Sequence, residues 1–195
     1  MKIIFYKCQI FILFLGVTGL EKQPLHLRFC LIKCKEFVNA DEIAKGISPF
    51  QPENVSFQAG RIMLERINNL LTQRLDFAIE TTLTTLSYKK TIEHAKKKGY
   101  TITLLFFWLN DVNLAIERVK TRVLEGGHNI PEDVIIRRYK KGILNLTDVF
   151  VNLCDYWLLI DNSCRPYTFI AEGNGAVDAV IYNDAKWNKI KNAIK

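Results

Sequence analysis

A carboxylate with polar neighbours follows a short strand-like run in the first third of the sequence. Asp41 comes directly after the run 36–40, and Asn39 and Glu42 lie beside it. Open α/β sheets bind ligands outside the carboxyl ends of their strands, and a carboxylate placed there has the chemistry of a general base. The alternative is an aspartate that only caps the next segment.

A second polar group follows the strand-like run 77–79. Glu80, Thr81 and Thr82 come there in succession, again at the expected carboxyl end of a strand. Such side chains can contact a substrate or the shell of a bound metal ion. Threonine is also common at strand ends, so an ordinary strand exit is an equally good interpretation.

Arginines flank a glycine-rich loop in the second half of the chain. Arg118 and Arg122 are four residues apart and share one helix face, and Arg137 belongs to the helix after the loop. The planar guanidinium group matches the geometry of phosphate oxygens. Phosphoryl transfer requires cations around the transferred group, because its negative charge is spread over several oxygens in the transition state. Each arginine taken singly is also compatible with a solvated helix face.

The loop between these helices, 126–131, contains two glycines, His128, Asn129 and a proline. Glycines permit hinge motion, which is typical of a lid over a reaction site. We interpret His128 as a hydrogen-bonding residue of this lid, because no second metal ligand stands near it in the sequence.

Strand-like and helix-like segments alternate from residue 35 onward, which is the pattern of an α/β domain with a parallel sheet. The run 100–109 is almost continuously apolar, as expected of a strand buried on both faces. We expect strands over 36–40, 76–80, 100–109, 156–160, 168–171 and 177–182, and helices over 52–74, 87–98, 111–125, from 131 and from 184. Gly99 is the expected stop of the second helix, and Trp108, Trp157 and Phe107 are expected in the core.

The composition is that of an ordinary globular protein: 195 residues with 49% hydrophobic and 24% charged side chains. It excludes wholesale disorder and a polytopic membrane protein. Of the net charge of +7, residues 1–32 carry +3, so the rest carries +4 and a polyanion-binding face is only weakly indicated. The odd set of five cysteines has no CxxC pair, so neither a disulfide framework nor a zinc site is expected, and a reducing cytoplasm fits best.

Residues 1–32 depart from this pattern. Two lysines precede the apolar stretch 10–17, which resembles a signal peptide. The stretch is too short to span a membrane and has no clear cleavage site, and the residues after it have a cytoplasmic character. Export is therefore the less favoured interpretation.

Several long motifs resemble the zeta-toxin-like P-loop kinases, and they occur in that family's order: EFVNADEIAKGISPFQPENVSFQAGRIML, FAIETTL, GGHNIPEDVIIRRYKKGILNL and DYWLLIDNS. The resemblance covers about residues 34–172. It implies a P-loop three-layer α/β sandwich, mostly parallel, with flanking helices and a helical lid. It also implies transfer of phosphate from ATP with Mg²⁺ to a small-molecule hydroxyl, which in the toxin members belongs to UDP-N-acetylglucosamine.

The resemblance also assigns roles to these polar and charged residues. Asp41 is implied as the general base, which we favour over the cap, and Asn39, Glu80, Thr81, Thr82, His128 and Asn129 as substrate contacts. Arg118 or Arg122 is implied at the nucleotide phosphates and Arg137 at the transferred group. Asp161 and Asn162 resemble the edge of the adenine pocket, although a plain turn is as good an interpretation.

A phosphate-binding GxxxxGK[ST] loop is missing where such a kinase should begin. The nearest candidate, 16–24, has the wrong spacing and places Glu21 where phosphate charge must sit. Read one base out of frame, however, the codons of this region permit MSNLYIILGCNGAGKTTASFTVLP, which contains a complete loop. We therefore predict an aberrant, frame-shifted segment at 1–32 and a kinase domain at 33–195, with residues 10–15 still able to fill the central strand.

The sequence thus predicts an ATP-dependent kinase that is inactive as written because the phosphate loop is absent. The alternative is a non-catalytic remnant that binds a protein partner such as an antitoxin. A basic nucleic-acid-binding protein is disfavoured, and neither a nucleic acid nor a membrane is expected as a partner.

Overall fold

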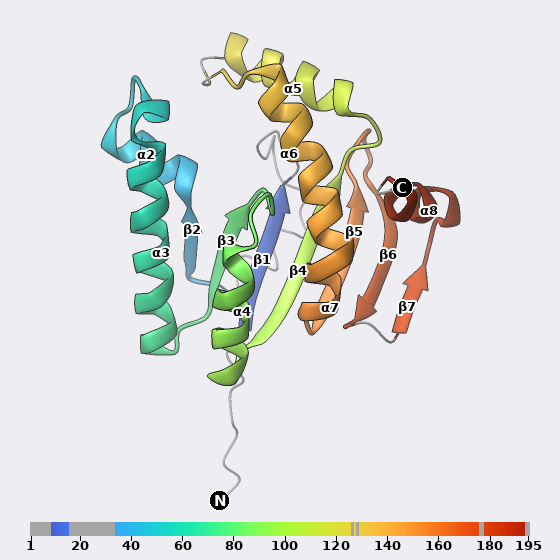
Figure 1. The fold of residues 1–195 in the computed structure, drawn as a ribbon, viewed down its shortest axis with the longest axis horizontal. Coiled ribbons are helices and arrows are strands. Elements are labelled where there is room, and N and C mark those ends of the chain that lie inside the picture. Colours follow the sequence, from blue (N-terminus) through green and yellow to red (C-terminus); the bar gives the residue numbers. More distant parts are fainter. Residues whose placement is uncertain (1–8, 16–33, 126, 128, 176–177, 194–195) are drawn as a thin grey trace, which may run out of the picture.

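The computed structural model describes residues 9–15, 34–125, 127, 129–175 and 178–193 of the chain. One seven-stranded sheet has the order β2-β3-β1-β4-β5-β6-β7 (Figure 1). Its strands are β1 (Gln9–Leu15), β2 (Glu36–Asn39), β3 (Phe77–Thr81), β4 (Thr101–Trp108), β5 (Tyr156–Asp161), β6 (Thr168–Asn174) and β7 (Asp178–Ile181).

The helices follow the strands in alternation. They are α2 (Ala40–Ile47), the 3₁₀ turn η1 (Pro52–Val55), α3 (Ser56–Gln73), α4 (Ser87–Lys97), α5 (Val112–Leu124), α6 (Glu132–Asn145), the π-helical turn η2 (Leu146–Phe150), α7 (Val151–Leu153) and α8 (Asp184–Asn192). Among these described helices, none is both long and apolar enough to cross a membrane.

The first five strands in the sheet order are parallel; β6 pairs antiparallel with β5, and β7 pairs antiparallel with β6 at the edge. β1 lies at the centre, paired with β3 on one side and β4 on the other, so residues 10–15 fill the central strand as expected. The chain leaves β1 toward β2 and later crosses to β4 on the other side. Such a switch in strand order opens a ligand crevice at the carboxyl ends.

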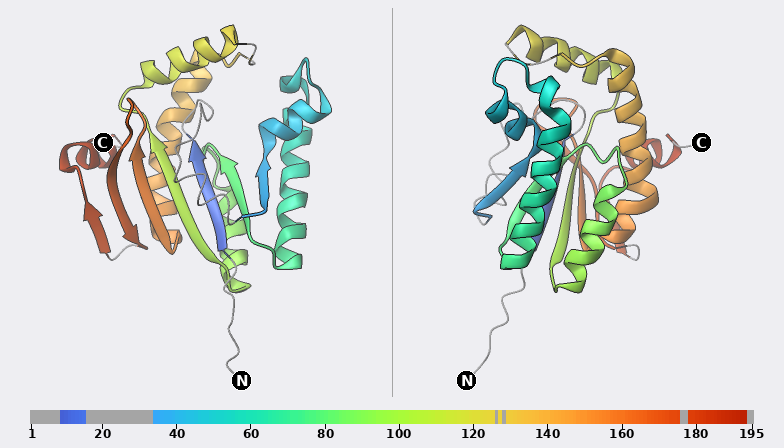
Figure 2. Two further views of the ribbon diagram at one scale, coloured as in Figure 1. Left: turned by 180° about the vertical axis from the view of Figure 1, so that it is seen from behind. Right: turned by 60° about the vertical axis from the view of Figure 1, so that its left-hand side comes forward.

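Apolar packing between the sheet and one layer of helices forms the main core. α3, α4 and α6 lie on the same face of the sheet, as the front and back views show (Figures 1 and 2). Phe77, Met63, Leu71, Phe150 and Trp157 are almost completely buried there. A smaller buried cluster with Leu105, Phe107 and Ile160 occupies the opposite face.

The predicted α/β class, with a mostly parallel sheet, flanking helices and a helical lid, is confirmed. Gly99 ends α4 with a φ of +88°, which explains the glycine, and Trp108, Trp157 and Phe107 are buried as expected. The expected first strand is β1, and the phosphate loop and helix expected after it fall on residues 16–33, which lie outside the described residues.

Several element boundaries differ from the prediction. The run 36–40 is strand only to Asn39, because this side chain caps a helix that begins at Ala40. The segment 52–74 divides into η1 and α3, since Pro52 starts a tight turn before the longer helix. The π-helical turn after α6 has no signal in the sequence pattern.

Candidate functional site

Asn39 joins the ends of two neighbouring strands. Its Oδ1 accepts hydrogen bonds from the backbone nitrogens of Asp41 (2.7 Å) and Glu42 (3.3 Å), so it is the N-cap of α2. Its Nδ2 donates to Oε2 of Glu80 at 2.6 Å. Two predicted site residues that are far apart in the sequence therefore meet at the carboxyl edge, where Asn39 and Glu80 are partners in the strand register.

Glu80 has a strongly perturbed carboxyl group. Its pKa is raised from 4.5 to about 7, mainly by burial and to a smaller extent by the charges of Asp41 and Glu42, while the hydrogen bond from Asn39 and the charge of Lys45 act in the opposite direction. Taking a carboxylate out of water disfavours its charged form, and nearby negative charges add to this. A carboxyl group that titrates near neutrality at the mouth of a parallel sheet is a candidate for acid–base or ligand chemistry.

Asp41 lies in the first turn of α2 and is exposed. Its carboxylate is at the positive end of the helix dipole, and the next residue, Glu42, forms an ion pair of 2.7 Å with Lys45. Asn39, not Asp41, caps this helix, so the capping alternative for Asp41 is wrong. The role of Asp41 as a general base stays a prediction.

The exit loop of β3 places Thr81 and Thr82 beside Glu80. Oγ1 of Thr81 accepts a hydrogen bond from the Leu83 nitrogen at 3.3 Å. The hydroxyls of Thr82 and Thr84 lie 3.1 Å apart. Thr81 and Thr82 are half-buried at the sheet edge, which agrees with their expected place.

The predicted arginines have different surroundings. Arg118 donates from Nη2 to the carbonyl oxygen of Asn162 at 2.6 Å, which links α5 to the end of β5. Arg122, one turn later, has Nε and Nη2 buried without a hydrogen-bond partner in the described part of the chain. Arg137 lies exposed on α6. Burying unpaired guanidinium nitrogens is costly, so Arg122 is poised for an anion.

The glycine loop packs tightly against the end of α5. The Gly127 nitrogen donates to the Arg122 carbonyl at 2.8 Å, and a Cβ at Gly127 would lie only 2.7 Å from Cγ of Arg122. Only glycine fits this contact. Asn129 is exposed, and His128 lies outside the described residues.

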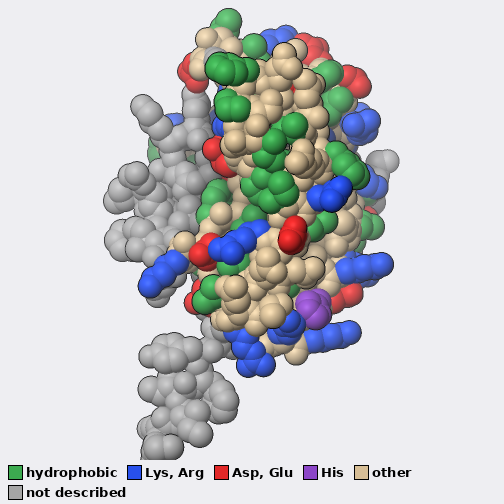
Figure 3. Space-filling view, turned by 90° about the vertical axis from the view of Figure 1, so that its left-hand side faces the viewer, with side chains coloured by type: hydrophobic (Ala, Val, Ile, Leu, Met, Phe, Trp, Pro, Cys, Tyr) green, Lys and Arg blue, Asp and Glu red, His purple; other side chains and the backbone are tan. Residues whose placement is uncertain are grey.

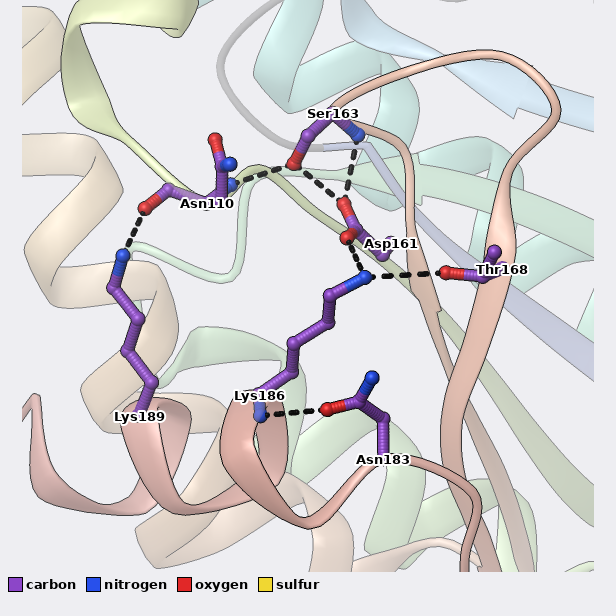
Figure 4. Close-up of polar contacts among 7 residues, drawn as sticks. All are labelled: Asn110, Asp161, Ser163, Thr168, Asn183, Lys186 and Lys189. Carbon is purple, nitrogen blue, oxygen red and sulfur yellow. Dashed lines mark hydrogen bonds and ion pairs between the residues drawn. The ribbon is translucent and has the colours of Figure 1, made fainter.

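Asp161 is almost completely buried, and its oxygens are engaged within the fold (Figure 4). Oδ2 pairs with Nζ of Lys186 at 2.6 Å, and Oδ1 accepts from the nitrogen and hydroxyl of Ser163 at 2.8 and 2.5 Å. Burial would raise the pKa of Asp161, but Lys186 and Ser163 together hold it below 3.8. The contacts between Asp161 and Ser163 are those expected of a plain turn. The role of Asp161 and Asn162 at the edge of an adenine pocket stays a prediction.

A cavity of about 320 Å³ lies beside the end of β4, away from the Asn39–Glu80 pair. Its lining consists of residues from β4, α5, α6 and α8: Trp108, Asn110, Asp111, Val112, Tyr139, Ile143, Lys189 and Ala193. None of the predicted site residues contributes to it.

Sequence reasoning missed two polar residues that the structure places near the carboxyl edge: Lys186 and Asn145. Lys186 comes from the last helix and Asn145 from α6, each far in sequence from its contact. No local pattern signals such pairings. Ser163 belongs to the turn expected at 161–163, and its hydrogen bond to Asp161 agrees with that interpretation.

Comparison with known proteins identifies the family of this parallel α/β fold. The family model described as Zeta toxin matches residues 34–154, so the chain belongs to the Zeta toxin family of kinase-like phosphotransferases. An uncharacterized protein of Haemophilus influenzae is 30% identical over 128 residues, which cover 66% of this chain and 91% of that protein.

Solved structures share the fold at low sequence identity. A structure from the PezAT chromosomal toxin–antitoxin system of Streptococcus pneumoniae superposes with a TM-score of 0.62 at 18% identity, covering 85% of this chain and 72% of that one. The AvrRxo1-ORF1:AvrRxo1-ORF2 complex with sulphate ions gives a TM-score of 0.75 at 17% identity and 96% coverage of this chain. Here the chain spans 64% of its counterpart. The same complex has also been solved with ATP, with a TM-score of 0.73.

Proposed function

We propose that this chain derives from an ATP-dependent kinase that phosphorylates a hydroxyl of a small molecule. UDP-N-acetylglucosamine is the particular acceptor suggested by the resemblance to zeta toxins. The AvrRxo1-ORF1:-ORF2 structure with ATP supports nucleotide use in this fold. The proposal places the reaction in the cytoplasm, where ATP is available.

The observation that carries the proposal is that Nε and Nη2 of Arg122, at the end of α5, are buried and have no hydrogen-bond partner in the described part of the chain. Two buried nitrogens without a partner destabilise the empty protein, whereas phosphate oxygens would satisfy both in a planar arrangement. Arg122 lies directly before the glycine loop, so a nucleotide phosphate bound there would also contact the lid. Arg122 therefore has a stronger claim on the phosphates than Arg118 or Arg137.

The acceptor side of the site lies at the ends of β2 and β3. We assign Asp41 as the general base for the acceptor hydroxyl, and Asn39, Glu80, Thr81 and Thr82 as the groups that orient the acceptor. Arg137 is assigned to the transferred phosphoryl group, whose charge is spread in the transition state. His128 and Asn129 would contact the substrates from the lid, and Asp161 and Asn162 would border the adenine.

Mg²⁺ accompanies ATP in this chemistry, and oxygen ligands suit it. The described residues contain no group of three or more His, Cys, Asp or Glu side chains able to hold a metal ion. The ion would therefore arrive with the nucleotide, and Glu80 and Thr82 offer oxygen atoms to its outer shell. Its chemistry would be to neutralise charge on the phosphates.

The chain as written should transfer phosphate only at background, because the sequence of residues 1–32 has no GxxxxGK[ST] motif, which supplies the amide groups, the lysine and the Mg²⁺-binding hydroxyl of a phosphate loop. We propose that this segment is an out-of-frame translation and that 33–195 is the kinase domain. Resequencing the start of the gene tests this: codons 8–31 that cannot spell the loop in the shifted frame would refute it.

The activity test compares the chain as written with a repaired chain, in which residues 8–31 are replaced by the shifted-frame peptide. Both are incubated with labelled ATP, Mg²⁺ and a panel of nucleotide sugars and sugars. The repaired chain should label a hydroxyl, and Asp41→Asn should abolish this, whereas the exposed control Asp133→Asn should not. Transfer by the chain as written, or none by the repaired chain, contradicts the proposal.

A second candidate is a remnant that binds a protein partner such as an antitoxin. Phe50 and Phe57 are 97% and 82% exposed at the corner between α2 and α3, and apolar side chains gather on the face seen in Figure 3. Large exposed apolar groups often mark protein interfaces. The PezAT and AvrRxo1-ORF1:ORF2 structures come from systems with a partner protein, which supports this candidate. Co-purification with a small acidic protein from an adjacent gene, lost in Phe50→Ser with Phe57→Ser, tests it.

A further inference from the structure

Asn145 is a buried amide inside the helix that follows the glycine loop. It is 3% exposed and lies at the end of α6, where the helix changes into the π-helical turn η2. Its Nδ2 donates to the carbonyl oxygen of Leu83 at 2.5 Å. π-Helical turns are rare in proteins, and those that occur are often found at functional sites. The junction between α6 and η2 is therefore a candidate for a functional role.

Leu83 adopts a backbone conformation that its side chain disfavours. Its φ is +45°, in the left-handed region, and its side chain is completely buried. A branched residue stays in this region only where the surrounding structure holds it. The Asn145 amide satisfies the Leu83 carbonyl and thereby supplies such a hold.

The conformation of Leu83 determines how β3 ends. In this exit loop the Leu83 nitrogen donates to Oγ1 of Thr81, and the positive φ at Leu83 then redirects the chain that follows. The same turn brings the hydroxyls of Thr82 and Thr84 together. Thr81 and Thr82, the two threonines assigned to the acceptor, thus contact residues of a turn that Asn145 holds from a different element.

A second contact fastens α6 to the neighbouring region. The Tyr139 hydroxyl donates to the carbonyl oxygen of Leu109 at 2.6 Å, just beyond the end of β4. β3 and β4 are the two neighbours of β1 in the sheet, so α6 holds the exit loops on both sides of the central strand (Figure 1). A helix that begins at the glycine loop is therefore tied to both loops.

We propose that Asn145 is a positioning residue that couples the lid helix α6 to the acceptor-binding threonines Thr81 and Thr82. Its role rests on the proposed function, because the threonines matter only if an acceptor binds there. Movement of α6 would reach the β3 exit loop through this amide, and the Tyr139 hydroxyl would transmit it to the β4 exit loop.

The test removes each contact separately. Asn145→Leu and Asn145→Ala both delete the amide: leucine fills the space that the amide leaves, and alanine avoids overpacking. Tyr139→Phe deletes only the hydroxyl that contacts Leu109. Hydrogen exchange of the full chain is followed for the peptide that covers 82–87 and for the peptide that covers 109–113. In the repaired chain, KM for the acceptor and for ATP is measured alongside kcat.

The asparagine variants should speed exchange in 82–87 at least tenfold and leave 109–113 unchanged, and Tyr139→Phe should do the reverse. The acceptor KM should rise about tenfold in the asparagine variants while the ATP KM stays constant. Unchanged exchange in 82–87, equal effects of all variants on both peptides, or equal rises in both KM values would overturn the coupling. A repaired parent chain that transfers no phosphate would refute the proposed function instead, and the exchange result would still decide whether Asn145 holds the loop.

Discussion

The raised pKa of Glu80 makes a quantitative prediction about how pH changes the stability of the chain. Glu80→Gln replaces the carboxyl group by a neutral amide whose oxygen can still accept the hydrogen bond from Asn39. The variant should have the same free energy of unfolding as the wild type near pH 4.5 and should become the more stable of the two as the pH rises from 4.5 to 7. The difference in the free energy of unfolding should level off above about pH 7.

The magnitude follows from the two ionisation equilibria of the carboxyl group. Its pKa is about 7 in the folded chain and 4.5 as the ordinary value. Because the folded state binds the proton more tightly, the stability that this gives is complete below pH 4.5 and is lost as the pH rises through 7. Each pH unit between the two values is worth about 1.4 kcal/mol, so the wild type loses about 3 kcal/mol that the variant keeps.

Urea unfolding followed by tryptophan fluorescence at intervals between pH 4.5 and 8 measures this difference. Glu93→Gln is the control, since Glu93 is exposed on α4 and its nearest cation, Lys89, is 4.0 Å away. The control should show a small difference with little pH dependence. A Glu80→Gln variant that is less stable than the wild type at pH 8, or a difference that does not change with pH, would show that the folded chain holds Glu80 ionised and would refute the reasoning.

Two further substitutions test the site. Arg122→Met should leave the ligand-free chain as stable as before or more stable by about 1 kcal/mol, because it removes two buried nitrogens that have no partner. It should also weaken ATP binding to the repaired chain at least tenfold, measured by calorimetry. Lys120→Met, on the exposed side of α5, is the control, and an equal loss of affinity in both variants would contradict the assignment. Asp161→Asn should lower the free energy of unfolding by about 2 to 3 kcal/mol at pH 7, because it breaks the ion pair with the partly exposed Lys186. Because the folded chain lowers the pKa of Asp161 below 3.8, the stabilisation by the ion pair is present above pH 3.8 and is lost as the pH falls below it. The melting temperatures of wild type and variant should therefore converge in acid. A difference in melting temperature that stays constant with pH would refute the ion pair.

The sequence predicted the parts of the fold that depend on local pattern. The continuous apolar run of β4 indicated a strand buried on both faces, and Gly99 indicated the end of α4, because each signal is carried by adjacent residues. The family motifs placed Asn39 and Glu80 at strand ends. Parallel pairing then required them to lie on one edge of the sheet.

The sequence could not predict which of these side chains pair or how their chemistry changes. The pKa of Glu80 depends on burial and on the carboxylates of α2, and the free nitrogens of Arg122 depend on how the end of α5 is covered. Desolvation and charge interactions act between groups that are distant along the chain, so no window of residues contains them.

The sequence by itself determined the class of fold, the order of its elements and the family, because strand alternation, helix stops and long motifs are local properties of the chain. The tertiary structure alone decided that Asn39 binds Glu80, that Lys186 neutralises Asp161, and that Asn145 holds Leu83 in a left-handed turn. Each of these contacts forms only when the sheet and its helices bring remote residues together and exclude water from them, which is the step that gives buried polar groups their energy and their chemistry.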